Sequence, residues 1–425
     1  MINAASLEAI KKAKFSKNFI KPLYDSYCFS NIPQTVKNLL LDEKKPALPL
    51  DVFGSLPQSY DKVIVFVIDS FGWKFFEKYS EKYSFLQHIK KNAVVSKLTT
   101  QYPPTTAAEM TTLHTGLAVG QSGVYEWFYY EPLVDAVIAP LLFSFAGKRV
   151  RDNLLATGIE PKKFFPIQTI YKDLQKNGIP SYVFQDVEYA YSPYCQVIFE
   201  GAGVSPYSTL SEAITNLTEK TLNDSGKGYY FLYFDKIDKK AHRYGSHTQQ
   251  FESEVDVLFY TLEKLLKNLQ GKLKNTLFIM TADHGHADID PATTIYLNEH
   301  YPKIKQWMKT SKNGEPIVAA GSCRNMYLHI KEDNLDEAQK FLQQELNGKG
   351  EVYKVVDLIK QNFYASSSVE LSKTFLDRVG NLVILCYSNQ SVWWYEKDKF
   401  EIKYHGHHGS MTPDEMETIF ACLPL

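Results

Sequence analysis

Four aspartates stand at the ends of four short apolar segments of this sequence. They are Asp69, Asp186, Asp235 and Asp283, and Asp238 follows three residues after Asp235. A single aspartate after a strand commonly serves as a turn residue. In an open α/β sheet, however, ligands bind beyond the carboxyl ends of the strands, so several such aspartates can converge on one crevice. Their charges would repel one another unless a divalent cation neutralised them, and we therefore expect a metal site.

Histidines accompany these carboxylates. Asp238 and His242 are four residues apart, which places both on one face of a helical turn, and His284 directly follows Asp283. Residues 404–409 read YHGHHG, in which glycines allow the backbone to approach a site closely. Mixed aspartate and histidine ligands suit Zn²⁺, with Mn²⁺ and other first-row ions as alternatives. The candidate histidines in or beside these segments are His242, His284, His286, His405, His407 and His408.

A hydroxyl nucleophile is available in the segment PPTTAAEM, residues 103–110. Two prolines, two threonines and then helix formers predict a loop that enters a helix, with Thr105 or Thr106 as the N-cap. A capping threonine can be purely structural. The N–H groups at a helix start also bind anions, and metal coordination makes a hydroxyl a usable nucleophile. A threonine here is therefore well placed against a phosphate group.

The hydrophobic pattern predicts the elements that position these residues. Apolar runs at 63–69, 181–186, 229–235 and 276–283 are typical of buried strands. The clearest helix covers 249–269, where apolar residues recur at three- and four-residue steps. Strands that alternate with helices predict an α/β fold, with a mainly parallel sheet flanked by helices.

A second, smaller unit is expected after residue 290. Short strands at 326–330 and 381–387 and a helix at 336–346 predict an inserted α+β cap lobe over residues 291–400. The catalytic domain would then comprise residues 1–290 and 401–425. The lobe would cover the metal crevice and select the substrate.

The composition excludes several classes of protein. Of 425 residues, 44% are hydrophobic and 22% are charged, which excludes a mainly disordered chain. The 47 basic and 48 acidic residues leave a net charge of −1, so we expect no specific binding of nucleic acid. No apolar run of about 18 residues predicts a membrane span, and the first residues do not resemble a secretory signal. The five scattered cysteines suit reduced thiols, and we expect a cytoplasmic protein of unknown oligomeric state.

In their order along the chain, these residues resemble the alkaline phosphatase superfamily, and most closely its type I phosphodiesterase/nucleotide pyrophosphatase family. The resemblance spans residues 60 to 410. The matching motifs are Asp69, Thr106 with Thr115-Gly116, Asp238-x-x-x-His242-x-x-Gly245, Asp283-His284-Gly285 and Gly406-x-His408-Gly409. The resemblance implies an alkaline-phosphatase-like fold and two bound metal ions, with Zn²⁺ expected and Mn²⁺ as the alternative.

The same resemblance implies a role for each matching residue. One metal would be held by Asp238, His242 and His408, and the second by Asp69, Asp283 and His284. Thr106 would lie between the metals, as a ligand and as the nucleophile. The ten-residue spacing to Gly116 selects Thr106 over Thr105, and the G-x-H-G frame selects His408 over His405 and His407. Asp235 would lie next to the metal ligands without binding a metal itself, and Asp186 matches no motif.

One segment departs from the family pattern. Where nucleotide pyrophosphatases have an asparagine that donates to a phosphate oxygen, this chain has Trp127, within an aromatic run from Tyr125 to Tyr130. No lysine or arginine stands between Lys97 and Lys148, so an aromatic wall would favour a diester over a monoester. Trp127 could donate its indole N–H to the phosphate, although such a run could equally be core packing. Arg324 and Lys403 are further candidate phosphate contacts.

The residues and the resemblance together predict a two-metal hydrolase of small phosphate esters. The expected activity is that of a phosphodiesterase, through a covalent threonyl-phosphate intermediate on Thr106. A phosphomonoesterase or phosphomutase of the same superfamily is the alternative. A metal-binding protein without turnover is a third hypothesis.

Overall fold

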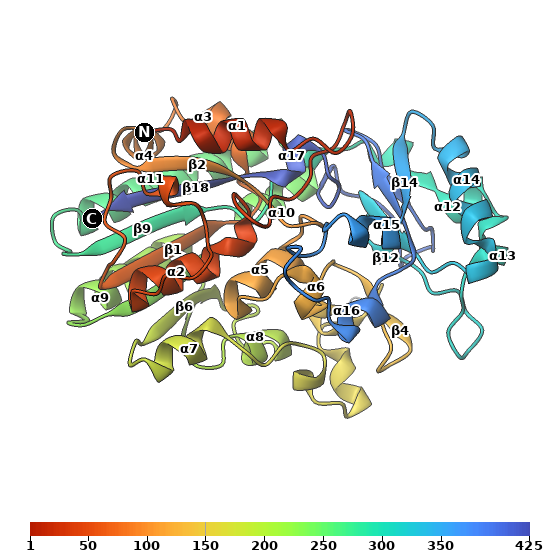
Figure 1. Ribbon diagram of the computed structural model, residues 1–425, viewed down its shortest axis with the longest axis horizontal. Coiled ribbons are helices and arrows are strands. Elements are labelled where there is room, and N and C mark those ends of the chain that lie inside the picture. The colour runs from red at the N-terminus through yellow and green to blue at the C-terminus, as the bar shows by residue number, and fades with distance from the viewer. Residues whose placement is uncertain (149) are drawn as a thin grey trace.

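The computed structural model describes residues 1–148 and 150–425. Its centre is a seven-stranded sheet in the order β2-β18-β9-β1-β8-β6-β7 (Figure 1). Neighbouring strands are parallel, except that β18 runs antiparallel to both of its neighbours. The strands are β1 (Lys62–Ile68), β2 (Val94–Thr99), β6 (Ser181–Asp186), β7 (Gly203–Tyr207), β8 (Gly228–Phe234), β9 (Thr276–Thr281) and β18 (Glu417–Pro424).

The four apolar runs of the sequence form β1, β6, β8 and β9, each within two residues of its expected ends. All seven residues of β1 are buried, because helices cover both faces of the sheet. Alternate side chains of this strand enter different cores: Val63, Val65 and Val67 face one, and Ile64, Phe66 and Ile68 face the other. The predicted α/β fold, with a mainly parallel sheet between helices, is confirmed.

Each face of the sheet has its own group of helices. The face of Val65 packs against α2 (Ile32–Leu41), α5 (Thr106–Thr115), α7 (Ile170–Lys176) and α8 (Pro193–Ile198). The face of Phe66 packs against α3 (Trp73–Tyr79), α4 (Ser84–Asn92), α9 (Leu210–Asn223) and α11 (Gln249–Leu269). The helix predicted at 249–269 is α11, and its eight buried residues are all apolar, as the periodicity requires.

A smaller antiparallel sheet forms a third core beside the main one (Figure 1). Its strands lie in the order β12 (Ala320–Gly321), β13 (Asn325–Leu328), β15 (Leu382–Cys386) and β14 (Gly350–Lys354), with α14 (Leu335–Glu345) packed beside them. Val137 and Ala146, from an earlier part of the chain, are buried in the same core. The boundaries expected at residues 290 and 400 stay a prediction.

The remaining elements connect these layers. The three strands β3 (Tyr129–Glu131), β4 (Ala136–Ala139) and β5 (Ser144–Phe145) form a separate antiparallel sheet. Short pairs join β10 (Ala287–Asp288) to β17 (Gly406–His407) and β11 (Ile295–Tyr296) to β16 (Val392–Trp393). The other helices are α1 (Ala4–Lys12), α6 (Val119–Ser122), α10 (Lys236–Tyr244), α12 (Leu297–His300), α13 (Ile304–Trp307), α15 (Val355–Lys360), α16 (Lys373–Arg378) and α17 (Pro413–Met416).

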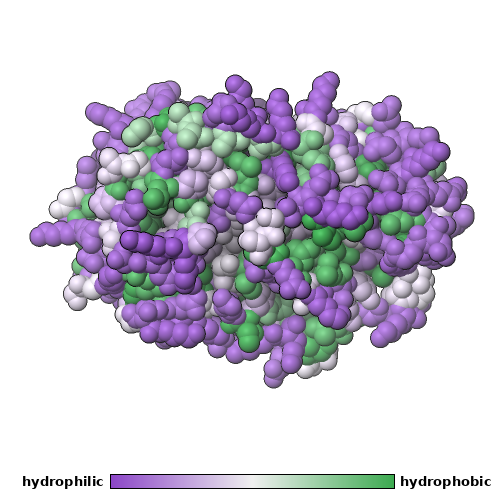
Figure 2. All heavy atoms as spheres, in the orientation of Figure 1, coloured by the Kyte–Doolittle hydropathy of each residue, from purple (hydrophilic) through white to green (hydrophobic). Residues whose placement is uncertain are grey.

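Hydrophilic side chains cover most of the face seen in Figure 2, with smaller apolar areas between them. Among residues 1–148 and 150–425, no helix combines the length and the apolar character that a membrane span needs. All five cysteines are buried as free thiols.

Candidate metal centre and active site

Three aspartates meet at the carboxyl edge of the main sheet. Asp69 follows β1, Asp283 lies two residues beyond β9, and Asp238 is in the first turn of α10, directly after β8. Because β8, β1 and β9 are adjacent parallel strands, their carboxyl ends place these residues side by side. All three side chains are buried.

Histidine nitrogens complete sets of candidate ligands around these carboxylates. His284 Nε2 lies 3.5 Å from Asp69 Oδ1 and 3.5 Å from Asp283 Oδ2. Asp238 Oδ1 lies 3.3 Å from His242 Nε2 and 3.9 Å from His408 Nε2. Ligand atoms within 4.8 Å of one another form three groups: Asp69, Asp283 and His284; Asp238, His284 and His408; and Asp238, His242 and His286.

The hydrogen bonding of the carboxylates fits bound cations. Asp69 Oδ1, Asp238 Oδ1 and Asp283 Oδ2 are buried and have no hydrogen-bond partner. The other oxygen is held in two of the three: Asp69 Oδ2 accepts from the Tyr233 hydroxyl, and Asp283 Oδ1 accepts from the backbone N–H groups of Ser70 and His284, both at 3.0 Å. An unpaired buried oxygen is costly, and a divalent cation would remove that cost.

The electrostatics point the same way. Burial, followed by the charge of Asp283, raises the pKa of Asp69 and of Asp238 well above the ordinary range of an aspartate. Closely packed carboxylates repel one another unless a positive charge compensates them. The donor set of aspartates and histidines is one that Zn²⁺ accepts.

The histidines are oriented by backbone carbonyls. His242 Nδ1 donates to Gly406 O at 2.6 Å, His284 Nδ1 to Gly285 O at 2.9 Å, and His408 Nδ1 to Pro104 O at 2.9 Å. Each bond fixes the tautomer in which Nε2 is free to face the centre. Burial also lowers the pKa of His242 to about 4 and that of His408 well below its usual value, so both are neutral at pH 7.

The two threonines of the PPTT segment have different environments. Thr105 is the N-cap of α5: its Oγ1 accepts from Ala108 N, donates to Tyr125 O at 3.3 Å, and is buried. Thr106 begins the helix, is partly exposed, and places Oγ1 3.1 Å from His284 Nε2. The accessible hydroxyl beside the candidate ligands is therefore that of Thr106.

The remaining strand-end aspartates are paired with lysines. Asp186 Oδ1 accepts from Glu188 N in a turn, and its Oδ2 pairs with Lys236 Nζ at 2.6 Å. Asp235 contacts Lys239 Nζ at 2.6 Å and Lys236 Nζ at 3.3 Å. These lysines supply the positive charge that Asp69, Asp238 and Asp283 lack.

The prediction that Arg324 contacts a phosphate is wrong. Its side chain is completely buried, and its guanidinium forms a two-point ion pair with Glu415 at 3.0 and 2.8 Å. The remaining N–H groups donate to the carbonyls of Cys386, Tyr387 and Gln390. All five donors are thus used within the protein. Lys403, for its part, pairs with Glu401.

The aromatic run from Tyr125 to Tyr130 is largely core packing. Tyr125 and Tyr129 are completely buried, and their rings stack at 5.3 Å. Phe128 stacks on Trp393, 6.2 Å away in the smaller sheet's core. Trp127 is 38% exposed and is the member of the run that faces solvent most openly. Its contact with a substrate stays a prediction.

Two residues near the centre received no role from the sequence. His286 was counted among the histidines but not assigned, although it completes a ligand group with Asp238 and His242. Glu126 is buried, and burial raises its pKa to about 8. A Cβ added to Gly409 would lie 3.0 Å from Glu126 Oε1, so only glycine fits at this position beside His408. A single glutamate within an aromatic run gives no sequence pattern from which its burial beside the metal centre could be predicted.

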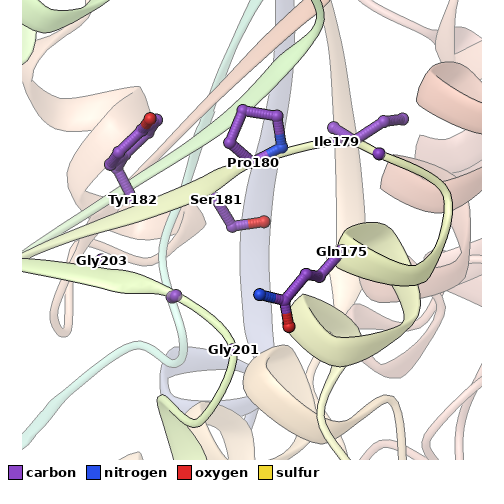
Figure 3. A pocket seen from close by; sticks show the side chains of 9 residues that line it. Gln175, Ile179, Pro180, Ser181, Tyr182, Gly201 and Gly203 are labelled. Carbon is purple, nitrogen blue, oxygen red and sulfur yellow. The ribbon is translucent and has the colours of Figure 1, made fainter.

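A pocket of about 570 Å³ lies elsewhere, at the main sheet, lined by Gln175, Ser181, Tyr182 and Gly203 among others (Figure 3). Ser181 and Gly203 are the first residues of β6 and β7. The pocket is therefore at the amino ends of the strands, opposite the edge that carries Asp69 and Asp283. It does not extend the metal centre.

The motif order and this geometry agree with a comparison with protein families. The model of the type I phosphodiesterase/nucleotide pyrophosphatase family matches residues 63–411. The chain belongs to this family. Family members are phosphoric ester hydrolases that depend on metal ions, and the buried aspartates and histidines of this member are consistent with a bimetallic site. No curated protein matches the sequence significantly.

Solved structures show the same fold at low sequence identity. Murine ectonucleotide pyrophosphatase/phosphodiesterase 5, as an inactive variant in complex with AMP, superposes with a TM-score of 0.63 at 20% identity, over 85% of this chain and 87% of that one. The human protein of the same name gives 0.62 at 18% identity, over 85% and 87%. Phosphonoacetate hydrolase from Sinorhizobium meliloti 1021, in complex with phosphonoformate, gives 0.58 at 15% identity, over 84% and 89%.

Proposed function

We propose that this family member is a two-metal phosphodiesterase that uses Thr106 as its nucleophile. The observation that carries the proposal is the set of three buried carboxylate oxygens without partners, on Asp69, Asp238 and Asp283, beside the accessible hydroxyl of Thr106. Within a family of metal-dependent phosphoester hydrolases, such a set suits two divalent cations around a nucleophile.

The proposed ligand sets follow the family motifs. Asp238, His242 and His408 would hold one ion. Asp69, Asp283 and His284 would hold the other, with Thr106 between them. Two bound ions, proposed to be Zn²⁺ with Mn²⁺ as the alternative, would lower the pKa of the Thr106 hydroxyl and offset the charge that develops on the phosphate.

The chain's own residues then perform a double displacement. Thr106 Oγ1 forms a bond to phosphorus while the bond from phosphorus to the leaving alcohol oxygen breaks, and the alcohol takes up a proton. The N-terminus of α5, where Thr106 lies, favours the negative charge of the phosphoryl group. Water then attacks phosphorus from the side that the alcohol vacated, so the bond to Thr106 breaks and its hydroxyl is restored.

The proposed substrate is a small phosphate diester. A monoester carries a second negative charge, which needs a cation, and the sequence has no lysine or arginine between Lys97 and Lys148. Trp127 offers exposed apolar surface and one indole N–H instead. AMP and phosphonoformate, the ligands of two of the similar structures, are small phosphorus oxyanions, so they support the size and the phosphorus chemistry of the proposed substrate but not its diester linkage. Because Trp127 replaces the family's asparagine, no nucleotide preference is proposed.

We further propose that residues 291–400 cover the metal crevice. Ser322 Oγ, from the loop between β12 and β13, lies 2.7 Å from Asn325 Oδ1 and 3.1 Å from the carbonyl oxygen of His408, so its one proton is shared between these two acceptors. A segment that holds the backbone of a candidate metal ligand is well placed to limit which substrates enter.

The deciding experiment is a substrate panel on metal-loaded protein. Nitrophenyl phosphate diesters, monoesters and phosphonates would be compared by kcat/KM. We expect the diesters to be turned over fastest, with activity lost on strong chelation and regained on adding Zn²⁺ or Mn²⁺. Faster turnover of monoesters would favour the phosphatase alternative. No turnover of any ester by protein with two bound metals would contradict the proposed function.

A further inference from the structure

His286 is held beside the centre by its own backbone. It follows Asp283-His284-Gly285 and immediately precedes β10, and its N–H donates to Asp414 O at 2.9 Å. Gly285 N donates to Glu415 O at 2.9 Å, so both residues are fixed against the segment that forms α17. The imidazole is buried, at 5% exposure.

The His286 side chain faces the unpaired oxygen of Asp238. Its Nδ1 lies 3.6 Å from Asp238 Oδ1, an atom that has no hydrogen-bond partner. Its ring is perpendicular to that of His242, with centroids 5.0 Å apart, and these three residues form a ligand group within 4.8 Å. Zinc–ligand bonds of about 2.0–2.2 Å in a tetrahedron separate the ligand atoms by about 3.3–3.6 Å. The distances of 3.3 Å from Asp238 Oδ1 to His242 and 3.6 Å to His286 fit that spacing.

His408, the family's third ligand, is less well placed for the same ion. Its Nε2 is 3.9 Å from Asp238 Oδ1, and it groups with His284, on whose ring it stacks at 3.7 Å. His286 is therefore the closer partner of the pair Asp238 and His242.

The chain makes room for this imidazole at Gly406. Strand β17 pairs with β10 through Asp288 and Gly406, which brings Gly406 next to His286. A Cβ on residue 406 would lie 2.1 Å from His286 Nε2, so a side chain there would displace the ring. Nε2 itself is buried without a partner, and Ser70 Oγ is 3.2 Å from Nδ1. In the tautomer with the proton on Nε2, the single lone pair of Nδ1 accepts from the Ser70 hydroxyl, and a bound metal ion would replace that donor.

We infer that His286 is a direct metal ligand, through Nδ1, of the ion held by Asp238 and His242. The inference rests on the proposed function only in requiring that the chain binds divalent metal. That ion then has three protein ligands at the end of β8 and β9, before any contribution from His408. The two histidines would bind the same metal through different ring nitrogens, His242 through Nε2 and His286 through Nδ1.

The test compares His286→Ala and His286→Asn with the control His407→Ala. His407 is also near His242, at 5.0 Å between ring centroids, and its Nε2 is also buried without a partner, but it belongs to none of the ligand groups found in the described residues. Zn²⁺ affinity is measured by chelator competition, and Co²⁺-loaded protein gives a visible spectrum of the ligand field. We expect both His286 variants to bind one ion at least about 100-fold more weakly and to change the Co²⁺ spectrum. The control should retain wild-type affinity.

A measurement on the wild type covers the case in which the variants do not fold. Protein with ¹⁵N-labelled histidine and bound ¹¹³Cd²⁺ should show cadmium coupling to Nδ1 of one histidine and to Nε2 of the others. Coupling to Nε2 nitrogens alone would overturn the inference, as would wild-type affinity in folded His286 variants or an equal loss in His407→Ala. These readouts do not involve turnover. A protein that binds Cd²⁺ through His286 but cleaves no ester would contradict only the proposed function.

Discussion

The hydroxyl oxygen of Thr106 lies 3.1 Å from Nε2 of His284, although 178 residues separate the two in the chain. Thr106 begins α5, which packs on one face of the sheet, and His284 follows β9 at its carboxyl edge. His284 in turn lies 3.5 Å from oxygens of both Asp69 and Asp283. The helix start and the strand end therefore bring a hydroxyl, an imidazole and two carboxylates to one point.

This relationship predicts that Thr106 and Thr105 differ sharply on substitution. Thr106→Ala should lower kcat by at least about 10³-fold while metal content and fold are kept, because only the nucleophilic oxygen is lost. Thr105→Ala removes an N-cap and should cost about 1 kcal/mol of stability with a much smaller effect on kcat. Steady-state kinetics and urea unfolding measure the two effects.

Thr106→Ser supplies the positive control, since it keeps a hydroxyl and should retain part of the activity. Mass spectrometry of acid-quenched wild-type protein should find phosphate on Thr106. Wild-type turnover by Thr106→Ala would end the covalent mechanism.

The proposed metal ligands can be tested by comparing substitutions of two aspartates at strand ends, Asp69 and Asp186. Asp69→Asn replaces an unpaired buried carboxylate, whereas Asp186→Asn replaces one that is paired with Lys236. We expect about two metal ions per wild-type chain by elemental analysis, about one in Asp69→Asn, and two in Asp186→Asn. Equal metal content in all three proteins would show that Asp69 is not a ligand.

The sequence predicted the sheet better than it predicted the surroundings of the centre. The strand at 181–186 and the helix at 249–269 were placed correctly, because continuous apolar runs and three-to-four periodicity report burial directly. The aspartates at the strand ends could be expected to meet, because parallel strands end at one edge. The shared environment of Asp69, Asp238 and Asp283 follows from that geometry.

Arg324 and Glu126 show where sequence reasoning stops. The sequence around a single arginine does not show whether its side chain faces a phosphate or a buried carboxylate. The partner of Arg324 is Glu415, which is 91 residues away in the chain. The carboxyl group of Glu126 is buried only because the crossing of distant segments places Gly409, Ser322 and Asn325 around it. Contacts between segments remote in sequence decide both positions, and no local pattern records them.

Glu126 should give the metal-free protein a distinctive pH dependence. Burial raises its folded pKa to about 8, above an unfolded value of about 4.3, so the folded state binds the extra proton between these limits. The contribution of this group to stability is therefore complete below about pH 4.3 and is lost as the pH rises to about 8. In this window the unfolding free energy of the wild type should fall as the pH rises, and Glu126→Gln should make that slope shallower by up to about 1.4 kcal/mol per pH unit. Urea unfolding of chelated protein from pH 5 to 8 measures it, and identical slopes would contradict the assignment.

Arg324 should matter for stability and not for substrate binding. Arg324→Ala leaves Glu415 buried without its cation, which should cost about 3–5 kcal/mol of unfolding free energy. Removing both charges, in Arg324→Met with Glu415→Leu, should recover much of that loss. Under conditions where the single variant is folded, KM should be close to that of the wild type. A large rise in KM with normal stability would restore the role of Arg324 as a phosphate contact.

Trp127 should affect substrate choice and leave the fold intact. Trp127 is 38% exposed and is not among the residues of the three hydrophobic cores, so Trp127→Ala should destabilise the fold by less than the roughly 3–5 kcal/mol typical of removing a fully buried aromatic side chain. If its indole N–H donates to the phosphate, the loss of about 1.5–3 kcal/mol of hydrogen bonding to a charged group should lower kcat/KM for diesters by a few tens of fold. Trp127→Phe keeps the aromatic surface but not the donor, and should lose nearly as much. If Trp127→Phe were as active as the wild type, Trp127 would act by stacking alone. If the wild-type protein turned over monoesters faster than diesters, the reason for an apolar contact at this position would be removed.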